Sequence, residues 1–428
     1  MILLILLLFI GLPIAFSLAS VGILLILFSG SGVHYLVSIP PLLFNNLNSF
    51  ILTCLPLFIL MGYILSNSGV AEMAYQGLAP WVSRIPGRLL VTNIASCTIF
   101  AAISGSSIAT AATIGKVAIP SQQARNYMPS AICGSLAAGG TLGILIPPSL
   151  NLIVYGAMTN QSVGRLFIAG VIPGLILASL FALFIILYSV FNPKVTPGLV
   201  ESYTWKARVF SLKGVLPFLV LIAAVLGSIY TGIATPTEAA AIGVFGAIVI
   251  ALALRRFSKS TAKETIVSTA QTTAWVCFIY LGAQVLGLGM SDAGLIEQLT
   301  HWAVGLPISP NLFIICLMGI YVVLGCLVEG FSLMIITLPI VYPIILKMGF
   351  DPIWFAIMMI LMCETALITP PVGLNLFVIQ GIAKVPSRVV IAGSWPYVLI
   401  LMMMMLVMLA FPTLATWLPS HMYGIPAS

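Results

Sequence analysis

Charged side chains are scarce in this sequence. Aspartate, glutamate, lysine and arginine make up 6% of the 428 residues, whereas a soluble domain carries about 25%. Hydrophobic residues make up 61%, and several apolar runs reach the ~20 residues that a membrane-spanning helix needs. The short alternating segments of a membrane β-barrel are also lacking. Because a helix satisfies its own backbone hydrogen bonds in lipid, the sequence predicts an all-α integral membrane protein.

Side chains that build enzyme centres are few as well. The three histidines are scattered, no HExxH motif occurs, and the two aspartates, Asp292 and Asp351, lie in predicted loops. We therefore find no paired-aspartate, histidine-metal or nucleophile–base site and predict that the protein is not an enzyme. The seven cysteines lie in apolar segments without metal-ligand or redox spacing, so we interpret them as small hydrophobic residues without disulfides.

The net charge of +7 comes mainly from short basic loops. Such loops orient a membrane protein, so the charge does not indicate nucleic-acid binding. The N-terminal apolar run lacks a basic leading segment and a clear cleavage site. We expect a retained helix there, and not a signal peptide.

An internal repeat is the strongest signal in the chain. Residues of the first half recur 223 positions later without a gap. The recurring residues are Pro120/Pro343, Pro129/Pro352, Pro147-Pro148/Pro370-Pro371, Arg165/Arg388, Ile168-Ala169-Gly170/Ile391-Ala392-Gly393, Pro173/Pro396 and, further back, Pro13/Pro236. Proline and glycine fix backbone geometry, so their shared register indicates two copies of one structure.

Each copy contains two unusual elements. In the first, apolar arms over 89–121 are divided by the polar tip Ser104–Ser107, which favours a re-entrant hairpin. The run 128–158 is long enough to span but is interrupted over 143–149, where two prolines remove backbone donors. The corresponding hairpin and broken helix of the second copy are predicted over 311–345 and 353–380.

The remaining elements follow from apolar runs and turn residues. Over 1–28 we expect one kinked helix, or a short extra element before Pro13 followed by a helix. We also expect an interfacial segment over 34–48, spans over 50–66, 170–191, 215–230, 236–254, 264–290 and 391–418, and a loop with one amphipathic piece over 67–88. Thr235-Pro236-Thr237-Glu238 has the pattern of a capping box.

The basic residues indicate how the copies are oriented. We divide the chain into a first inverted repeat over 1–191, a cytoplasmic linker over 192–214 and a second inverted repeat over 215–428. With the basic loops in the cytoplasm, all of the sixteen lysines and arginines except Arg165 and Lys347 lie on or toward that side. The two copies are then antiparallel, which defines an inverted-topology repeat.

Inverted repeats with broken helices are typical of secondary transporters. Each break exposes carbonyl groups that suit a cation such as Na⁺ and N–H groups that suit an anion. Two pseudo-symmetric sodium sites are therefore predicted. Site 1 comprises Ile103, Ser104, Ser106, Ser107, Gly143, Ile146 and Ser149; site 2 comprises Gly325, Val328, Glu329, Ala366, Thr369 and Val372.

Further side chains are candidates for binding the substrate or coupling its transport to an ion. They are Ser107, Pro148, Gly330, Glu364, Asn375 and Arg125. Carboxylates within a membrane are functional by default, so Glu329 and Glu364 are the foremost of the acidic candidates. Alternatives stay open: Glu329 and Glu364 could bond helix to helix, the serines could bond to their own backbone, and Arg125 could anchor the chain at the membrane surface.

At these motifs the chain resembles the large membrane subunit of tripartite ATP-independent periplasmic (TRAP) transporters of the dicarboxylate or sialic-acid type. The resemblance covers nearly the whole sequence and rests on six segments. These are Gly11–Phe16, Phe100–Ser107, Gly140–Ser149, Leu166–Gly170, Thr235–Ala240 and Ile368–Asn375.

The resemblance implies an elevator-type transporter in the bacterial inner membrane that uses two or more Na⁺ ions to import an organic anion. It also implies two partners, a small four-helix membrane subunit and a periplasmic substrate-binding protein. Two alternatives remain. One is a stand-alone ion-coupled carboxylate symporter or antiporter of similar architecture. The other is a channel, which usually builds its pore from oligomeric rather than internal symmetry.

Overall fold

The computed structural model describes residues 2–29, 32–196, 203–326, 328–371 and 373–423, and the regular structure in these ranges is helical. The elements up to the linker are α1 (Ile2–Phe9), α2 (Ile14–Phe28), η1 (Gly32–Ser38), α3 (Ile39–Leu47), η2 (Phe50–Thr53), α4 (Cys54–Asn67), α5 (Val70–Val82), α6 (Leu89–Ser104), α7 (Ser107–Gln123), α8 (Pro129–Leu145), α9 (Leu150–Thr159), α10 (Val163–Phe191) and η3 (Pro193–Val195). They are followed by α11 (Trp205–Ser211), η4 (Leu212–Gly214), α12 (Leu216–Tyr230), α13 (Pro236–Ala253), α14 (Lys259–Asp292), α15 (Leu295–Val304), α16 (Pro310–Gly325), α17 (Gly330–Lys347), α18 (Pro352–Ile368), α19 (Leu374–Ala383), α20 (Ser387–Ala410) and α21 (Thr413–Tyr423).

Several of these elements are long and apolar enough to cross a membrane. Seven described helical segments are long and apolar enough, or eight if the bent pair Trp205–Gly214 and Leu216–Tyr230 forms one span. The prediction of an all-α membrane protein is confirmed. Helix α17, the second arm of the second hairpin, is itself long enough to cross the membrane. Its length alone therefore does not favour a re-entrant hairpin over a spanning helix. Re-entry and the inverted orientation of the copies stay predictions.

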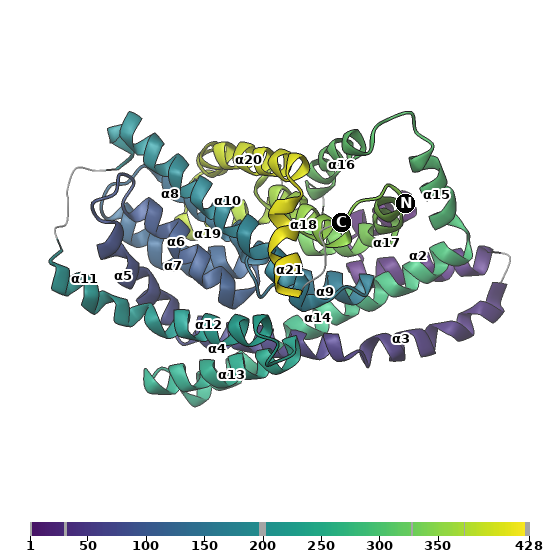
Figure 1. Ribbon diagram of the computed structural model, residues 1–428, viewed down its shortest axis with the longest axis horizontal. Helices are drawn as coiled ribbons and strands as arrows, with labels where there is room; N and C mark the ends of the chain where they lie inside the picture. The colour runs from purple at the N-terminus through teal and green to yellow at the C-terminus, as the bar shows by residue number, and fades with distance from the viewer. Residues whose placement is uncertain (1, 30–31, 197–202, 327, 372, 424–428) are drawn as a thin grey trace.

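One set of helices forms a long layer along the lower edge of the molecule in Figure 1. It includes α3, α4, α12, α13 and α14. Helices α2 and α14 pack closely at glycines, since a Cβ atom added at Gly282 would lie 2.5 Å from the carbonyl oxygen of Ala15. Helix α13 begins at the predicted capping box, in which Thr235 and Glu238 exchange hydrogen bonds. This part of the prediction is confirmed.

The second set contains the paired and broken helices, and it lies above that layer in Figure 1. Helices α6 and α7 pack against α8, whereas α16 and α17 pack against α18. Each hairpin also packs on the other copy's broken helix: α7 of the first copy packs on α19 of the second, and α17 of the second packs on α9 of the first. The two broken helices therefore lie between the two hairpins and share one core.

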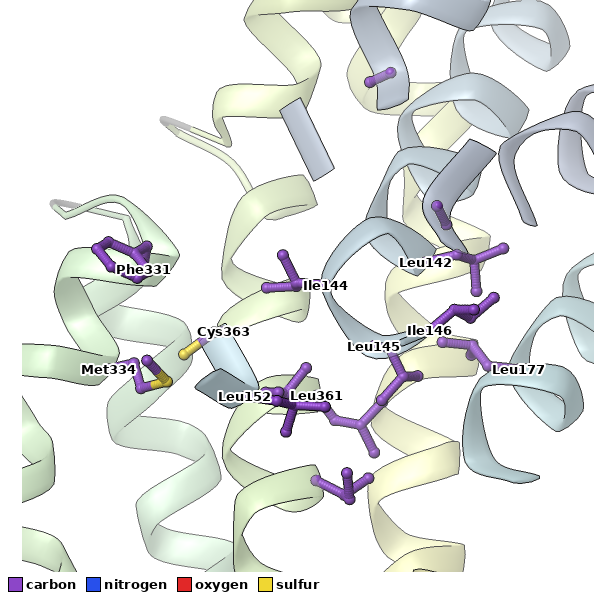
Figure 2. Packing of buried hydrophobic residues seen from close by; sticks show 14 of the residues in the cluster. Leu142, Ile144, Leu145, Ile146, Leu152, Leu177, Phe331, Met334, Leu361 and Cys363 are labelled. Carbon is purple, nitrogen blue, oxygen red and sulfur yellow. The ribbon is translucent and has the colours of Figure 1, made fainter. Parts of the chain in front are cut away.

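Figure 2 shows part of that core. Phe331 and Met334 of α17 lie on one side, Leu361 and Cys363 of α18 lie between, and Leu142, Leu145 and Leu177 lie on the far side. Helix α18 is buried along its length from Ile353 to Ile368. A helix that is buried on every face belongs in the centre of the protein, where neighbouring helices surround it.

Helix boundaries recur at the offset found in the sequence. Helices α7 and α8 begin at Ser107 and Pro129, and α17 and α18 begin at Gly330 and Pro352, in each case 223 residues later. The Pro147-Pro148 and Pro370-Pro371 bonds are both cis. The correspondence of boundaries supports two copies of one structure.

Four expectations about element boundaries are wrong. The region 1–28 holds two helices, which is the alternative of a short element before Pro13 and not the single kinked helix, because the chain turns at Gly11 (φ 89°) and Pro13 cannot donate a backbone hydrogen bond. Helix α10 begins at Val163, seven residues before the expected start, because Ser162 caps it. The linker 192–214, expected as a polar loop, contains the short helix α11. The span 391–418 is interrupted at Phe411–Pro412, between α20 and α21.

Helix α15 was not expected. It follows the left-handed Gly294 (φ 67°), much as α5 follows Gly69 (φ 66°). The two short helices thus occupy corresponding places in the two halves, although the sequence indicated an amphipathic piece only in the first.

Candidate functional site

The first hairpin meets the first helix break at very short range. Helix α6 ends in the left-handed Gly105 (φ 59°), and Ser106 caps α7 by accepting a hydrogen bond from the Ala109 N–H at 3.4 Å. A Cβ atom added at Gly143 would lie 2.6 Å from the Ser106 carbonyl oxygen. A Cβ atom at Gly105 would lie 2.9 Å from the Pro148 carbonyl oxygen. The glycines therefore let the hairpin tip touch the break.

Hydroxyl groups cluster at this junction. Ser104 Oγ lies 2.7 Å from Thr110 Oγ1 and 3.3 Å from the Ser106 carbonyl oxygen. Ser149 caps α9 through the Leu152 N–H at 3.4 Å and is fully buried. Oxygen atoms of this kind are the ligands that hard monovalent and divalent cations prefer.

The second hairpin meets the second break in the same way. A Cβ atom added at Gly325 would collide with the Cβ of Ala366. A Cβ at Gly330 would lie 3.1 Å from the Cys363 carbonyl oxygen. Glu329 takes the place of Ser106 and caps α17, since its Oε2 accepts hydrogen bonds from the N–H and Oγ of Ser332, both at 3.1 Å.

A cavity of about 370 Å³ connects the two hairpin tips with the long helix layer. Its walls come from the Ser104–Ala109 tip, from Glu329 and Phe331, and from α4 and α14 of the layer. Figure 2 shows two of the lining residues, Phe331 of α17 and Ile144 of α8. A cavity at the junction of repeats is where secondary transporters bind their substrates.

A buried carboxylate lies directly behind this cavity. Ser107 lines the cavity and donates a hydrogen bond of 2.6 Å to Glu364 Oε1, while Glu364 Oε2 has no hydrogen-bond partner among the described residues. Asn375 is close by: a Cβ atom at Gly140 would lie 3.0 Å from Asn375 Nδ2 and 3.1 Å from the Ser107 carbonyl oxygen. Asn375 Nδ2 donates to the Ala137 carbonyl oxygen at 3.3 Å. One cluster therefore joins residues of both repeats.

Apart from Ser149, Glu364, Asn375 and Arg125, the predicted site residues divide into three groups. Ser104, Ser106, Ser107 and Glu329 line the cavity. Gly143, Pro148, Gly325, Gly330 and Ala366 form the hairpin–break contacts described above, whereas Ile103 packs against α4, with its carbonyl oxygen 3.4 Å from a Cβ atom added at Gly62. Of the others, Ile146 packs near Gly174, Thr369 donates to the Thr365 carbonyl oxygen at 2.6 Å, Val328 is half-buried, and Val372 is outside the described residues.

Arg125 is not at the cavity. Its side chain is exposed beyond the end of α7, where it donates to the carbonyl oxygen and Oγ of Ser121 at 3.0 and 2.8 Å. This position suits the anchoring alternative better than substrate binding.

Sequence reasoning missed the lining residues that come from the helix layer and from α9. Tyr63, Thr272 and Trp275 line the cavity from α4 and α14, and Asn151 lines it from the start of α9. Only Asn151 had a usable signal, as a polar residue directly after the Pro-Pro-Ser break. The others lie in ordinary apolar spans.

The fold and the chain's sequence both match known transporters. The family model described as "Tripartite ATP-independent periplasmic transporter, DctM component" matches residues 1–414. The chain belongs to this family. The predicted resemblance to the large TRAP membrane subunit is thereby confirmed, and so is the prediction that the protein is not an enzyme.

Individual relatives agree with this assignment. A C4-dicarboxylate TRAP transporter large permease protein of Pseudomonas aeruginosa is 35% identical over 399 residues, which covers 92% of each chain. A protein of the same description from Vibrio cholerae is 34% identical and covers 97% of this chain and 95% of its own. The crystal structure of the YdaH transporter of Alcanivorax borkumensis has a TM-score of 0.58 at 16% identity, over 94% of this chain and 91% of that chain. At that identity the likeness shows the fold alone.

Proposed function

We propose that the chain is the substrate-translocating subunit of a sodium-coupled importer of an organic anion, in the bacterial inner membrane. The observation that carries this proposal is the cavity at which both hairpin tips meet α4 and α14. The relatives' descriptions name C4-dicarboxylates, and sialic acid or a similar carboxylate belongs to the same class of anion.

The geometry of the tips supports a role for both a cation and an anion. Helices α7 and α17 begin at the cavity, and the first N–H groups of a helix lack partners within it and attract negative charge. Carbonyl and hydroxyl oxygens of the hairpin–break contacts lie beside these N-termini. Binding of Na⁺ there would fix each tip against its break and shape the anion site.

Coupling follows from this arrangement. If Na⁺ and the anion each favour the closed tips, each raises the affinity for the other by the same factor. An elevator motion would then carry both past the helix layer of α2, α4 and α12–α14. The family description implies a tripartite system, so we propose a small membrane subunit and a periplasmic binding protein as partners.

Uptake into proteoliposomes tests the proposal. The full chain, its small subunit and the binding protein encoded with them are reconstituted, and radiolabelled organic anion is added under an inward Na⁺ gradient. We expect uptake that an equal K⁺ gradient does not support. Uptake without the binding protein would instead favour the stand-alone symporter or antiporter, and uptake that is indifferent to Na⁺ would contradict the proposal.

A further inference from the structure

We propose that the linker helix α11 and the following turn η4 bind the headgroup of an anionic phospholipid from the cytoplasmic leaflet. The inference goes beyond the proposed function, because it concerns a surface outside the transport cavity. Three observations carry it: a groove lined by lysine and aromatic side chains, a buried arginine behind that groove with unpaired donors, and an exposed apolar surface on the adjoining helix α12.

Helix α11 packs on α5, which lies beside it in Figure 1. Trp81 Nε1 donates a hydrogen bond to the Arg208 carbonyl oxygen at 3.1 Å, and Ser211 Oγ donates to the Gly77 carbonyl oxygen at 2.8 Å. A Cβ atom added at Gly77 would lie 2.7 Å from the Ser211 carbonyl oxygen, so the two backbones approach closely. These contacts fix one face of α11, and the opposite face can contact a ligand without rearrangement of the helix.

The opposite face carries a groove of about 450 Å³. Trp205, Val209 and Phe210 line it, and all three side chains are more exposed than buried. Lys206 and Lys213 complete the lining, and both are exposed. The Lys213 ammonium group lies 4.5 Å from the centre of the Phe210 ring, which is a cation–π distance. No acidic side chain is among the described residues that line the groove, so the groove suits an anion.

A third positive charge lies behind this groove. Arg208 is 7% exposed, and its Nε and Nη2 atoms have no hydrogen-bond partner among the described residues. Its Cζ atom lies 5.3 Å from the centre of the Trp205 ring, which lines the groove. A buried charge without a counter-charge is unfavourable, and an anion within several ångströms reduces that cost. Arg208 does not line the groove, so we assign its effect to its charge and not to direct contact with the ligand.

The groove adjoins a surface that faces lipid tails. The segment Trp205–Gly214 meets the apolar helix α12 at a bend of 50°, and Leu216, Leu219 and Val220 at the start of α12 are exposed. Aromatic side chains gather at the level of lipid headgroups, with apolar side chains beside the tails. A phospholipid therefore fits better than a soluble anion, because its acyl chains can lie along α12 while its headgroup occupies the groove.

The lysines select among phospholipids by charge. The linker 192–214 is expected on the cytoplasmic side, where membranes present anionic lipid. A lysine at the membrane surface strengthens the binding of anionic lipid by a factor of about five. A zwitterionic headgroup carries its own positive charge and gains much less from Lys206 and Lys213. We therefore use phosphatidylglycerol as the anionic probe and phosphatidylcholine as the zwitterionic one.

Native mass spectrometry of the full chain in a neutral detergent tests the proposal. The chain is titrated with each of the two lipids, carrying the same acyl chains, and the dissociation constant of the first bound lipid is determined. We expect phosphatidylglycerol to bind at least about tenfold more tightly than phosphatidylcholine. Glycerol 3-phosphate and inorganic phosphate carry negative charge without acyl chains, and an excess of either should not displace phosphatidylglycerol.

Variants connect this selectivity to the groove. Lys206→Gln combined with Lys213→Gln should weaken phosphatidylglycerol binding at least about tenfold and phosphatidylcholine binding less than about twofold. Lys259→Gln combined with Lys263→Gln is the matched control, because these two lysines are exposed at the start of α14 and do not line the groove. Arg208→Gln removes a charge but no lining atom, and it should weaken phosphatidylglycerol binding about threefold while phosphatidylcholine binding stays unchanged.

The outcomes are distinct. Equal binding of the two lipids overturns the inference, as does an equal loss of phosphatidylglycerol binding in the two double-lysine variants. Displacement by glycerol 3-phosphate or inorganic phosphate would mean a site for a soluble anion and overturns the assignment to lipid. An equal loss of both lipids in the Arg208→Gln variant would reject the role of its charge. Sodium-driven uptake does not enter any of these measurements, so the proposed function is tested separately.

Discussion

Ser107 Oγ donates a hydrogen bond of 2.6 Å to Glu364 Oε1, across 257 positions of sequence. Ser107 stands in the first turn of α7 and lines the cavity, whereas Glu364 is fully buried in α18. The pair joins the hairpin of one repeat to the broken helix of the other. Both residues were predicted as candidates, but nothing in the sequence indicated that they touch.

Replacing only Ser107 should lower the stability of the protein more than replacing both Ser107 and Glu364. Ser107→Ala leaves Glu364 buried without its donor, and we expect a loss of about 1–3 kcal/mol in stability. Glu364→Gln keeps an oxygen that can accept from Ser107 and should cost less. A double-mutant cycle with Ser107→Ala and Glu364→Leu should show a coupling energy of about 1 kcal/mol or more by denaturant or thermal unfolding. Strict additivity would mean that the hydrogen bond does not contribute.

Gly143→Ala tests the contact between the first hairpin and its break. Alanine is favoured over glycine in a helix by up to about 1 kcal/mol. Here the new Cβ would lie 2.6 Å from the Ser106 carbonyl oxygen, and relieving that overlap costs typically 1–3 kcal/mol. We expect net destabilisation together with weaker Na⁺ stabilisation.

Gly319→Ala is the control for this substitution. It lies within α16, and no atom would lie within 4 Å of its added Cβ. The control should be unchanged or slightly more stable, with the Na⁺ response of the native chain. A Gly143→Ala protein that behaves like the control would show that the tip does not need to touch the break.

The second contact offers a rescue experiment. Gly325→Ala should lower thermal stability and transport, because its Cβ would collide with the Cβ of Ala366. Adding Ala366→Gly removes the obstructing atom and should restore both properties toward the native values. If the double variant is no better than Gly325→Ala alone, the loss does not arise from this contact.

Much of the fold could be predicted from the sequence because its signals are local and strong. Long apolar runs define α4, α10 and α14, and the Pro-Pro pairs define the two breaks. Helix α15 was missed because its ten residues include Glu297 and His301 and follow directly on the longest helix. A short amphipathic helix of this kind does not stand out as an apolar span; its signal is the helical spacing of Leu295, Leu299 and Trp302.

The candidate site was predicted only in part, for the same reason. The hairpin tips and breaks carry polar and proline residues that stand out in an apolar chain. Trp275 and Thr272 do not, since an aromatic or threonine residue in a span usually faces lipid or a neighbouring helix. Only the fold brings α14 beside the tips. Arg125, which the sequence offered as a candidate, is directed away from the cavity by the end of α7.

The central claim is that Na⁺ binds where each hairpin tip meets its break. The most direct measurement is the thermal unfolding midpoint of the purified chain across a Na⁺ titration, with K⁺ replacing Na⁺ at constant ionic strength. We predict a saturable, Na⁺-specific rise that Ser106→Ala and Glu329→Gln weaken. Glu329→Gln keeps an oxygen that can cap α17, so its fold should persist. Equal midpoints in Na⁺ and K⁺, or an unchanged Na⁺ response in both variants, would contradict the account.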